Sequence, residues 1–130
     1  MARSAPPLTA QELLDAWAEL DVLRGKTLEE MRRYPVLLCP VASVPAFRHG
    51  ERSWVVEGQT VEYWDAWRYS QWFNVLAAPA VVVPVGRSPE GLPIGVQVVA
   101  RPFQDETALG IAGIVDAAFG YRAPVMSAKK

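Results

Sequence analysis

The sequence has few of the side chains on which most enzymes and metal sites depend. It holds one cysteine, Cys39, one histidine, His49, and three lysines, two of which are the last residues of the chain. A single cysteine excludes an internal disulfide and favours a reducing compartment, so we expect a cytoplasmic protein. No cysteine or carboxylate accompanies His49 at metal-ligand spacing, and we expect neither a metal nor a cofactor.

Charge excess and long apolar runs are absent as well. Thirteen basic residues against fourteen acidic ones give a formal net charge of −1, which predicts no nucleic-acid partner. No apolar run is long enough to span a bilayer, and the first residues lack the apolar core of a signal peptide. With 130 residues, 51% of them hydrophobic, the chain is long enough for one soluble domain, residues 1–130.

The first third of the chain indicates a loose leader, residues 1–8, followed by helices over residues 9–33. Thr9 and Glu12 form a capping-box pattern ahead of an amphipathic run, which we expect to end near Gly25. A second box, Thr27 with Glu30, predicts a short helix that ends before a proline.

Residues 34–130 alternate strand and helix patterns. Residues 36–42 and 79–86 read as strands, and residues 91–100 as a third that pairs antiparallel with the second. Pro84 and Pro93 predict irregular or edge positions there. Thr60 is expected to cap a helix carrying aromatic residues. The sequence therefore predicts an α/β fold, a small mixed sheet with flanking helices.

The last helix is expected to start with Asp105 as its N-cap. Its predicted buried face is Ile111, Ile114, Val115, Ala118 and Phe119. Gly110 and Gly113 inside this helix each cost about 1 kcal/mol relative to alanine, which we expect close backbone approach to the sheet to offset.

No residue set predicts catalysis. Cys39 is interpreted as a buried strand cysteine and His49 as a surface-loop residue. No serine lies in a Gly-x-Ser-x-Gly elbow. The carboxylates at the chain's start favour a solvated helix face: Glu12, Asp15, Glu19 and Asp21. The aromatic stripe of Tyr63, Trp64 and Trp67 is more typical of a core or interface than of a ligand platform.

One series of motifs goes beyond these patterns. The segments "NVLAAPAVVVPVG", "GLPIGVQVV" and "PFQDETAL" resemble the C-terminal signature of the amidase signature family. "LLCPVASVPAFRHG" resembles an earlier strand and loop of that family less specifically, and the first thirty or so residues match least. The matching positions are Asn74, Pro79, Ala80, Pro84, Gly86, Gly91, Leu92, Pro93, Gly95, Gln97 and Asp105.

The resemblance implies amide hydrolysis by a Ser–cis-Ser–Lys triad in the complete enzyme. The lysine segment and the glycine-serine-rich segment that supply this triad in the family have no counterpart here, so no catalytic residue is assigned. The family's C-terminal segment helps wall the acyl-binding cleft, which makes Tyr63, Trp64 and Trp67 candidates for a wall suited to an apolar or aryl group. Ala77 stands where the family has glycine, and alanine is strained there if its φ is positive.

Two hypotheses remain open. The chain is a C-terminal fragment of an amidase, inactive without the missing N-terminal region, or a free-standing, non-catalytic binding or oligomerisation module derived from that family. A third, an independent enzyme with different chemistry, has no residue set behind it. Both leading hypotheses expose strand edges and apolar surface, so we expect self-association as a homodimer.

Overall fold

The chain is seen in a computed structural model that describes residues 7–122. Its backbone contacts divide it into two units, Met1–Tyr34 and Pro35–Lys130. The first unit contains one helix, and the second contains two sheets and three further helices within the described residues. This arrangement confirms the predicted α/β class.

The first unit is a single helix, α1 (Ala10–Arg33). Its N-terminus forms the predicted capping box: the Glu12 backbone N–H donates to Thr9 Oγ1 at 3.2 Å, and the Thr9 backbone N–H donates to Glu12 Oε2 at 2.8 Å. The prediction of two helices was wrong, because the helix continues through Gly25. Thr27 is not a cap, since its hydroxyl donates back to the Leu23 carbonyl at 3.0 Å inside the helix.

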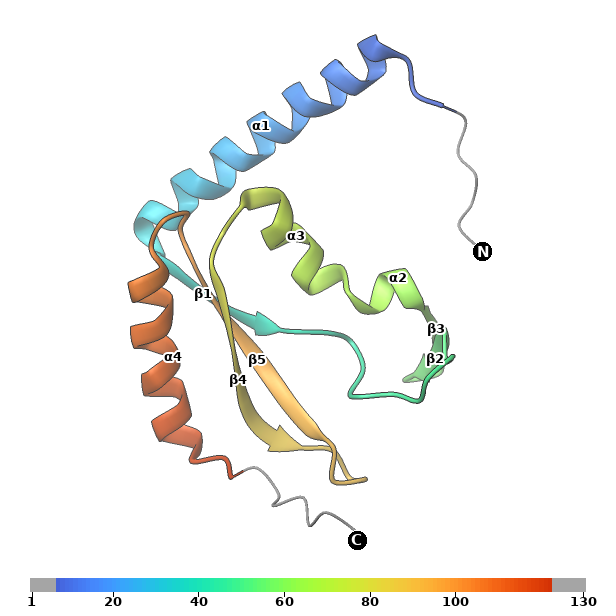
Figure 1. The fold of residues 1–130 in the computed structure, drawn as a ribbon, viewed down its shortest axis with the longest axis vertical. Helices are drawn as coiled ribbons and strands as arrows, with labels where there is room; N and C mark the ends of the chain where they lie inside the picture. The colour runs from blue at the N-terminus through green and yellow to red at the C-terminus, as the bar shows by residue number, and fades with distance from the viewer. Residues whose placement is uncertain (1–6, 123–130) are drawn as a thin grey trace, which may run out of the picture. The chain divides into compact units, whose positions relative to one another are not determined.

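The second unit is built on a three-stranded sheet in the order β1–β5–β4 (Figure 1). Its strands are β1 (Val36–Pro40), β4 (Ala80–Arg87) and β5 (Pro93–Ala100), and every pairing is antiparallel. The predicted antiparallel pairing of the last two strands is therefore confirmed. So is the irregularity near Pro84, where the register shifts between Pro84 and Gly86.

Each face of this sheet carries one apolar cluster. On one face α3 (Arg68–Leu76) packs Phe73 and Leu76 against Val99 of β5. On the other face α4 (Asp105–Phe119) packs Ala112 against Val83 and Val98. Because side chains alternate along a strand, neighbours Val98 and Val99 serve opposite clusters, and the central strand β5 carries apolar residues on both faces, with Gln97 as its polar exception.

A second sheet, the hairpin of β2 (Ser53–Val56) and β3 (Gln59–Glu62), lies where a helix was expected to begin. Glu57 and Gly58 have φ values of 49° and 78°, the left-handed geometry of a two-residue hairpin turn. Thr60 therefore lies in a strand and caps no helix. The helical run that follows is also divided, into α2 (Tyr63–Ala66) and α3, with Trp67 between them.

The last helix differs from its prediction in three respects. Gln104 precedes its first residue, so Asp105 lies in the first turn and is not the N-cap. The side facing the sheet carries Ala108, Ile111, Ala112 and Val115, whereas Ile114 and Phe119 are 65% and 61% exposed. An added Cβ at Gly110 or Gly113 would meet nothing within 4 Å, so these glycines make no close approach to the sheet.

The outer strands leave apolar side chains in contact with solvent. Leu38 of β1 and Val82 of β4 are 59% and 55% exposed, and β1 and β4 each pair on one side only among the described residues. Within residues 7–122, none of the helices has the length and apolar character needed to cross a membrane.

Candidate ligand groove

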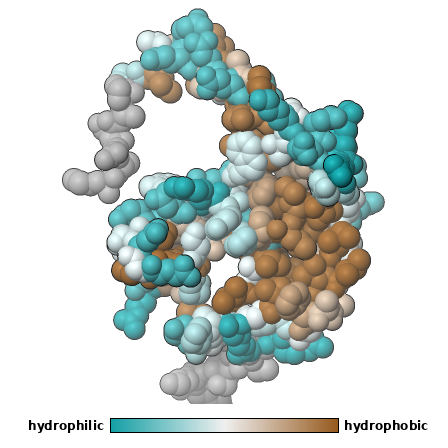
Figure 2. Space-filling view, turned by 180° about the vertical axis from the view of Figure 1, so that it is seen from behind, coloured by the Kyte–Doolittle hydropathy of each residue, from teal (hydrophilic) through white to brown (hydrophobic). Residues whose placement is uncertain are grey.

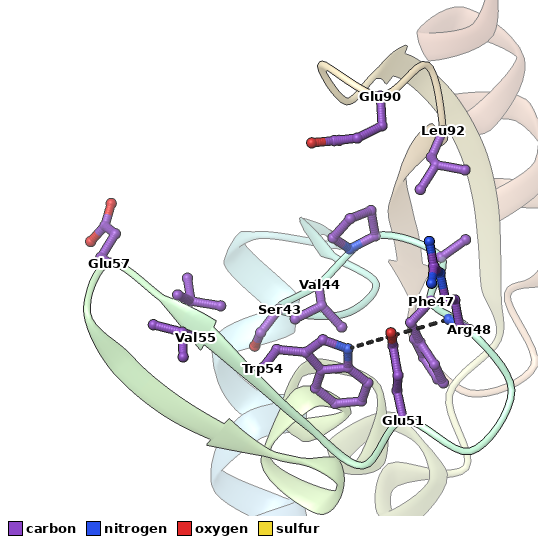
Figure 3. Close-up of a pocket in the computed structure, with 13 residues that line it drawn as sticks. Ser43, Val44, Phe47, Arg48, Glu51, Trp54, Val55, Glu57, Glu90 and Leu92 are labelled. Atoms are coloured by element: carbon purple, nitrogen blue, oxygen red, sulfur yellow. Dashed lines mark hydrogen bonds between the residues drawn. The ribbon is translucent and has the colours of Figure 1, made fainter.

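The second unit carries an open groove of about 820 Å³. Its base is the loop that follows β1, and its walls come from the β2–β3 hairpin and the turn between β4 and β5 (Figure 3). Glu57 marks the hairpin tip, and Glu90 and Leu92 mark the opposite turn. The lining is mainly apolar: Val44, Pro45, Ala46, Phe47, Trp54, Val55, Val56 and Leu92.

Four aromatic rings form a cluster at this groove: Phe47 and Trp54 line it, and Tyr63 and Trp67 lie behind them. Phe47 lies at its centre, with ring centroids 4.7 Å from Trp54, 6.4 Å from Tyr63 and 6.1 Å from Trp67. The guanidinium of Arg52 stacks on the Tyr63 ring at 4.9 Å. Tilted and edge-on contacts of this kind each add about 0.5–1.5 kcal/mol beyond the buried area, so the loop and the hairpin hold each other in place.

One carboxylate fixes the polar side of the groove. Glu51 Oε2 accepts from the Arg48 backbone N–H at 3.1 Å and from Trp54 Nε1 at 3.3 Å, as the dashed lines of Figure 3 show. These bonds join the loop to the first strand of the hairpin and set the orientation of the Trp54 ring. The groove therefore has a fixed aromatic wall with a charged rim.

The three aromatic residues singled out from the sequence lie in different surroundings. Tyr63 is half-buried in the aromatic cluster, and Trp64 is 70% exposed. Trp67 lines a second hollow of about 360 Å³ that shares the loop residues 43–47 with the groove. The indole N–H of Trp67 is buried and has no hydrogen-bond partner among the described residues.

Sequence analysis missed the two rings nearest the groove, Phe47 and Trp54. A signal was available for Trp54: two β-rich runs separated by Glu57 and Gly58 are typical of a hairpin. Phe47 lies in an irregular loop, and only tertiary packing brings it to Trp54.

The residues of the resembled motif gather in and around the three-stranded sheet. Asn74 lies in α3, Pro79 before β4, Pro84 and Gly86 in β4, Gly91 in the following turn, Pro93, Gly95 and Gln97 in β5, and Asp105 at the start of α4. Gly91 has φ of +84°, and a Cβ on Gly95 would lie 3.0 Å from Val82 Cγ1. Both positions therefore favour glycine.

Gln97 is the one buried polar side chain of the described core, 2% exposed. Its Nε2 donates to the Pro40 carbonyl at 2.7 Å and to the Tyr69 carbonyl at 3.3 Å. One amide thus ties β5 to the end of β1 and to α3. Most residues of the motif shape the sheet beside the groove. Leu92 lines the groove itself, and Pro93 and Gly95 line the smaller hollow.

Cys39, Ser70 and Ser88 are nucleophilic side chains whose surroundings do not activate them. Burial raises the pKa of the Cys39 thiol, against a smaller opposing hydrogen bond with Gln97, so the thiol is protonated at neutral pH. Ser70 Oγ donates to the Trp67 carbonyl and Ser88 Oγ accepts from the Leu92 N–H, both within local turns. Among residues 7–122, no three histidine, cysteine or carboxylate side chains come together as metal ligands.

Comparison with known proteins identifies the family. The family model described as Amidase matches residues 3–109. The chain belongs to the amidase family.

Individual relatives agree with this assignment. A glutamyl-tRNA(Gln) amidotransferase subunit from Xanthobacter autotrophicus is 35% identical over 89 residues, which is 68% of this chain and 17% of that protein. The fatty acid amide hydrolase of Arabidopsis thaliana is 38% identical over 80 residues, 62% of this chain and 12% of that protein.

Solved structures of the family share the fold. A crystal structure of an amidase superposes with a TM-score of 0.78 at 30% identity, covering 87% of this chain and 26% of the amidase. The crystal structure of the corresponding glutamyl-tRNA(Gln) amidotransferase subunit from Thermotoga maritima gives 0.75 at 26% identity, covering 91% of this chain and 26% of that protein. The chain thus spans about a quarter or less of the amidases that it matches.

Proposed function

We propose that this chain is the C-terminal part of an amide-hydrolysing enzyme of the amidase family, and that it supplies scaffold and substrate wall. The observation that carries the proposal is the shared fold, which covers most of this chain and only 26% of a solved amidase. Hydrolysis of a carbon–nitrogen amide bond then belongs to the complete protein, with a serine nucleophile and its partners in the N-terminal region. A single, half-buried cysteine is consistent with a cytoplasmic location.

The groove supports a role in binding an apolar or aryl part of the substrate. Phe47 and Trp54 present aromatic surface, and Tyr63 and Trp67 back them. The unpaired indole N–H of Trp67 beside the smaller hollow would be satisfied by an acceptor such as an amide oxygen. We assign Tyr63 and Trp67 to support of this wall, and Trp64, turned to solvent, to contact with a further part of the enzyme.

Alone, the chain is expected to hydrolyse no amide. The test is to incubate it with benzamide and other aryl amides and to measure released ammonia against a buffer blank. Turnover above the blank that disappears on replacing one serine would overturn this expectation.

Binding is tested separately from chemistry. Titration of the chain with benzamide, followed by tryptophan fluorescence, should show saturable binding that Phe47→Ala weakens. Phe103→Ala is the matched control, since the Phe103 side chain is 95% exposed and lines neither hollow. Equal weakening by both variants would contradict the assignment of the groove.

The alternative function is a free-standing, non-catalytic module that binds a partner or itself. The observation favouring it is the exposed apolar surface, including Leu38, Val82 and Ile114. We propose homodimerisation as its simplest form. Light scattering at about 10 to 200 µM distinguishes a dimer from a monomer, a range chosen for a small interface.

A further inference from the structure

The base of the groove carries one uncharged hydroxyl in a mainly apolar lining. Ser43 lines both the groove and the smaller hollow. The other polar side chains that line the groove are the Trp54 indole, whose N–H is bound to Glu51, and four charged groups. Ligand pockets are typically apolar, with a few polar groups that fix the orientation of the ligand, and Ser43 is such a group here.

The backbone of Ser43 is fixed while its hydroxyl has no protein partner. The Ser43 backbone N–H donates to the Ala66 carbonyl at 2.9 Å, which ties the loop to the end of α2. Within residues 7–122 the hydroxyl takes part in no hydrogen bond. The hydroxyls of Ser70 and Ser88, in contrast, are bound in local turns. In Figure 3 the Ser43 oxygen is directed toward the hairpin that carries Trp54, so it is available to a ligand in the groove.

The charged side chains of the groove are mainly acidic. Glu51, Glu57 and Glu90 line it, and Arg48 is the one cation of the lining in the described part of the chain. Glu57 and Glu90 stand on opposite walls (Figure 3), and neither forms a salt bridge with another described residue. The rim therefore has an excess of negative charge, which disfavours an anionic ligand.

We propose that the groove selects a neutral aryl ligand that carries a carbonyl group. The Ser43 hydroxyl donates to the carbonyl oxygen, and Phe47 and Trp54 contact the aryl part. Glu57 and Glu90 disfavour the corresponding carboxylic acid in its ionised form. This inference rests on the proposed function and deepens it, because it names the class of ligand and the side chains that recognise it.

The charge preference has a consequence for amide hydrolysis in the complete enzyme. Water converts an amide into a carboxylic acid and an amine, and a carboxylic acid with a pKa of about 4 is ionised at neutral pH. The neutral amide enters the groove without repulsion, whereas Glu57 and Glu90 repel the anionic product. The rim of the groove therefore favours release of the acid.

The first experiment compares two ligands of nearly the same shape, benzamide and isopropylbenzene, of which only benzamide has a carbonyl group. NMR chemical shifts of the isotope-labelled chain follow the binding of each ligand. Ser43→Ala should raise the dissociation constant of benzamide about three- to tenfold, the effect of one neutral hydrogen bond, and leave that of isopropylbenzene unchanged. Ser53→Ala is the matched control, since Ser53 is exposed in β2 and lines neither hollow, and it should change neither constant.

The second experiment compares benzamide with benzoate at low ionic strength. Benzoate should bind about two- to tenfold more weakly because of the exposed carboxylates, and added salt should narrow this difference. The double variant Glu57→Gln with Glu90→Gln should narrow it as well. Glu106→Gln is the matched control, because Glu106 is exposed in the first turn of α4 and lines neither hollow.

The outcomes distinguish this inference from the proposed function. If neither benzamide nor isopropylbenzene shifts the resonances of groove residues, the groove is not a substrate wall, and both proposals are wrong. If both ligands bind and Ser43→Ala leaves benzamide unchanged, or weakens both ligands equally, the wall stands and the role of Ser43 is wrong. Benzoate that binds as tightly as benzamide at low ionic strength would overturn the selection by charge.

Discussion

Replacement of Ala77 by glycine should make this protein more stable. Ala77 ends α3 with φ of 50° and ψ of 39°, the left-handed region. Its N–H donates to the Asn74 carbonyl at 3.2 Å, and the N–H of Ala78 donates to the Phe73 carbonyl at 3.1 Å. This pair of bonds is the Schellman motif, in which the left-handed residue is usually glycine. The strain anticipated at this position is therefore present.

The size of the gain follows from two opposing terms. An L-residue in the left-handed region costs about 1–2 kcal/mol, which glycine removes. Glycine also has more freedom in the unfolded chain, which cancels about 0.5–1 kcal/mol of that gain. The net stabilisation should lie between about 0 and 1.5 kcal/mol, equivalent to a rise of up to about 6 °C in Tm.

Thermal and urea unfolding at one fixed protein concentration measure this difference. Ala78→Gly is the matched control, because Ala78 has no positive φ and packs on the Phe73 cluster. Ala78→Gly should destabilise the chain, whereas Ala77→Gly should stabilise it. A lower Tm for Ala77→Gly, or the same sign for both variants, would refute the reasoning.

Three further predictions follow from single residues. Gln97→Leu removes the side-chain donor that ties the Pro40 and Tyr69 carbonyls to β5 and should lower the free energy of unfolding in urea by about 1–3 kcal/mol, a loss that an unchanged midpoint would rule out. Burial raises the pKa of Cys39, so its alkylation by iodoacetamide should reach half-maximal rate at higher pH in the folded chain than in urea; coincident profiles would contradict this. The backbone hydrogen bond from Thr9 lowers the pKa of Glu12, so its support of α1 is present above the unfolded pKa and is lost as the pH falls through the folded one. Circular dichroism should show a loss of helical signal at acid pH in the wild type. Glu12→Ala should show no such loss, because it lacks the titrating carboxylate.

Local patterns determined much of the fold. The alternation of apolar segments with turn residues predicted β1, β4, β5 and the final helix, and the motif from Asn74 to Asp105 indicated the family that the comparisons confirm. These features are set by near neighbours in the chain, as is the capping box at Thr9. Even the strain at Ala77 could be anticipated, since a glycine is expected where a helix ends in the left-handed region.

The buried side of α4 and the rings at the groove depended on packing between elements that are distant in the sequence. The apolar periodicity of α4 led to the prediction that Ile114 and Phe119 are buried, yet the sheet covers Ala108 and Ala112. The spacing of apolar residues along a helix does not determine which side of that helix turns toward the sheet. The aromatic content of residues 63–67 drew attention to Trp64, which is exposed, while Phe47 and Trp54 came to the groove through a loop and a hairpin.

The sequence by itself therefore determined β1, β4, β5 and the last helix, the capping box at Thr9 and the family, since each depends on residues close together in the chain. The tertiary structure alone decided which side of α4 stays bare, which rings line the groove, and that one amide, Gln97, joins β1, β5 and α3. Those outcomes depend on contacts between segments that are distant in sequence, and no local pattern encodes them.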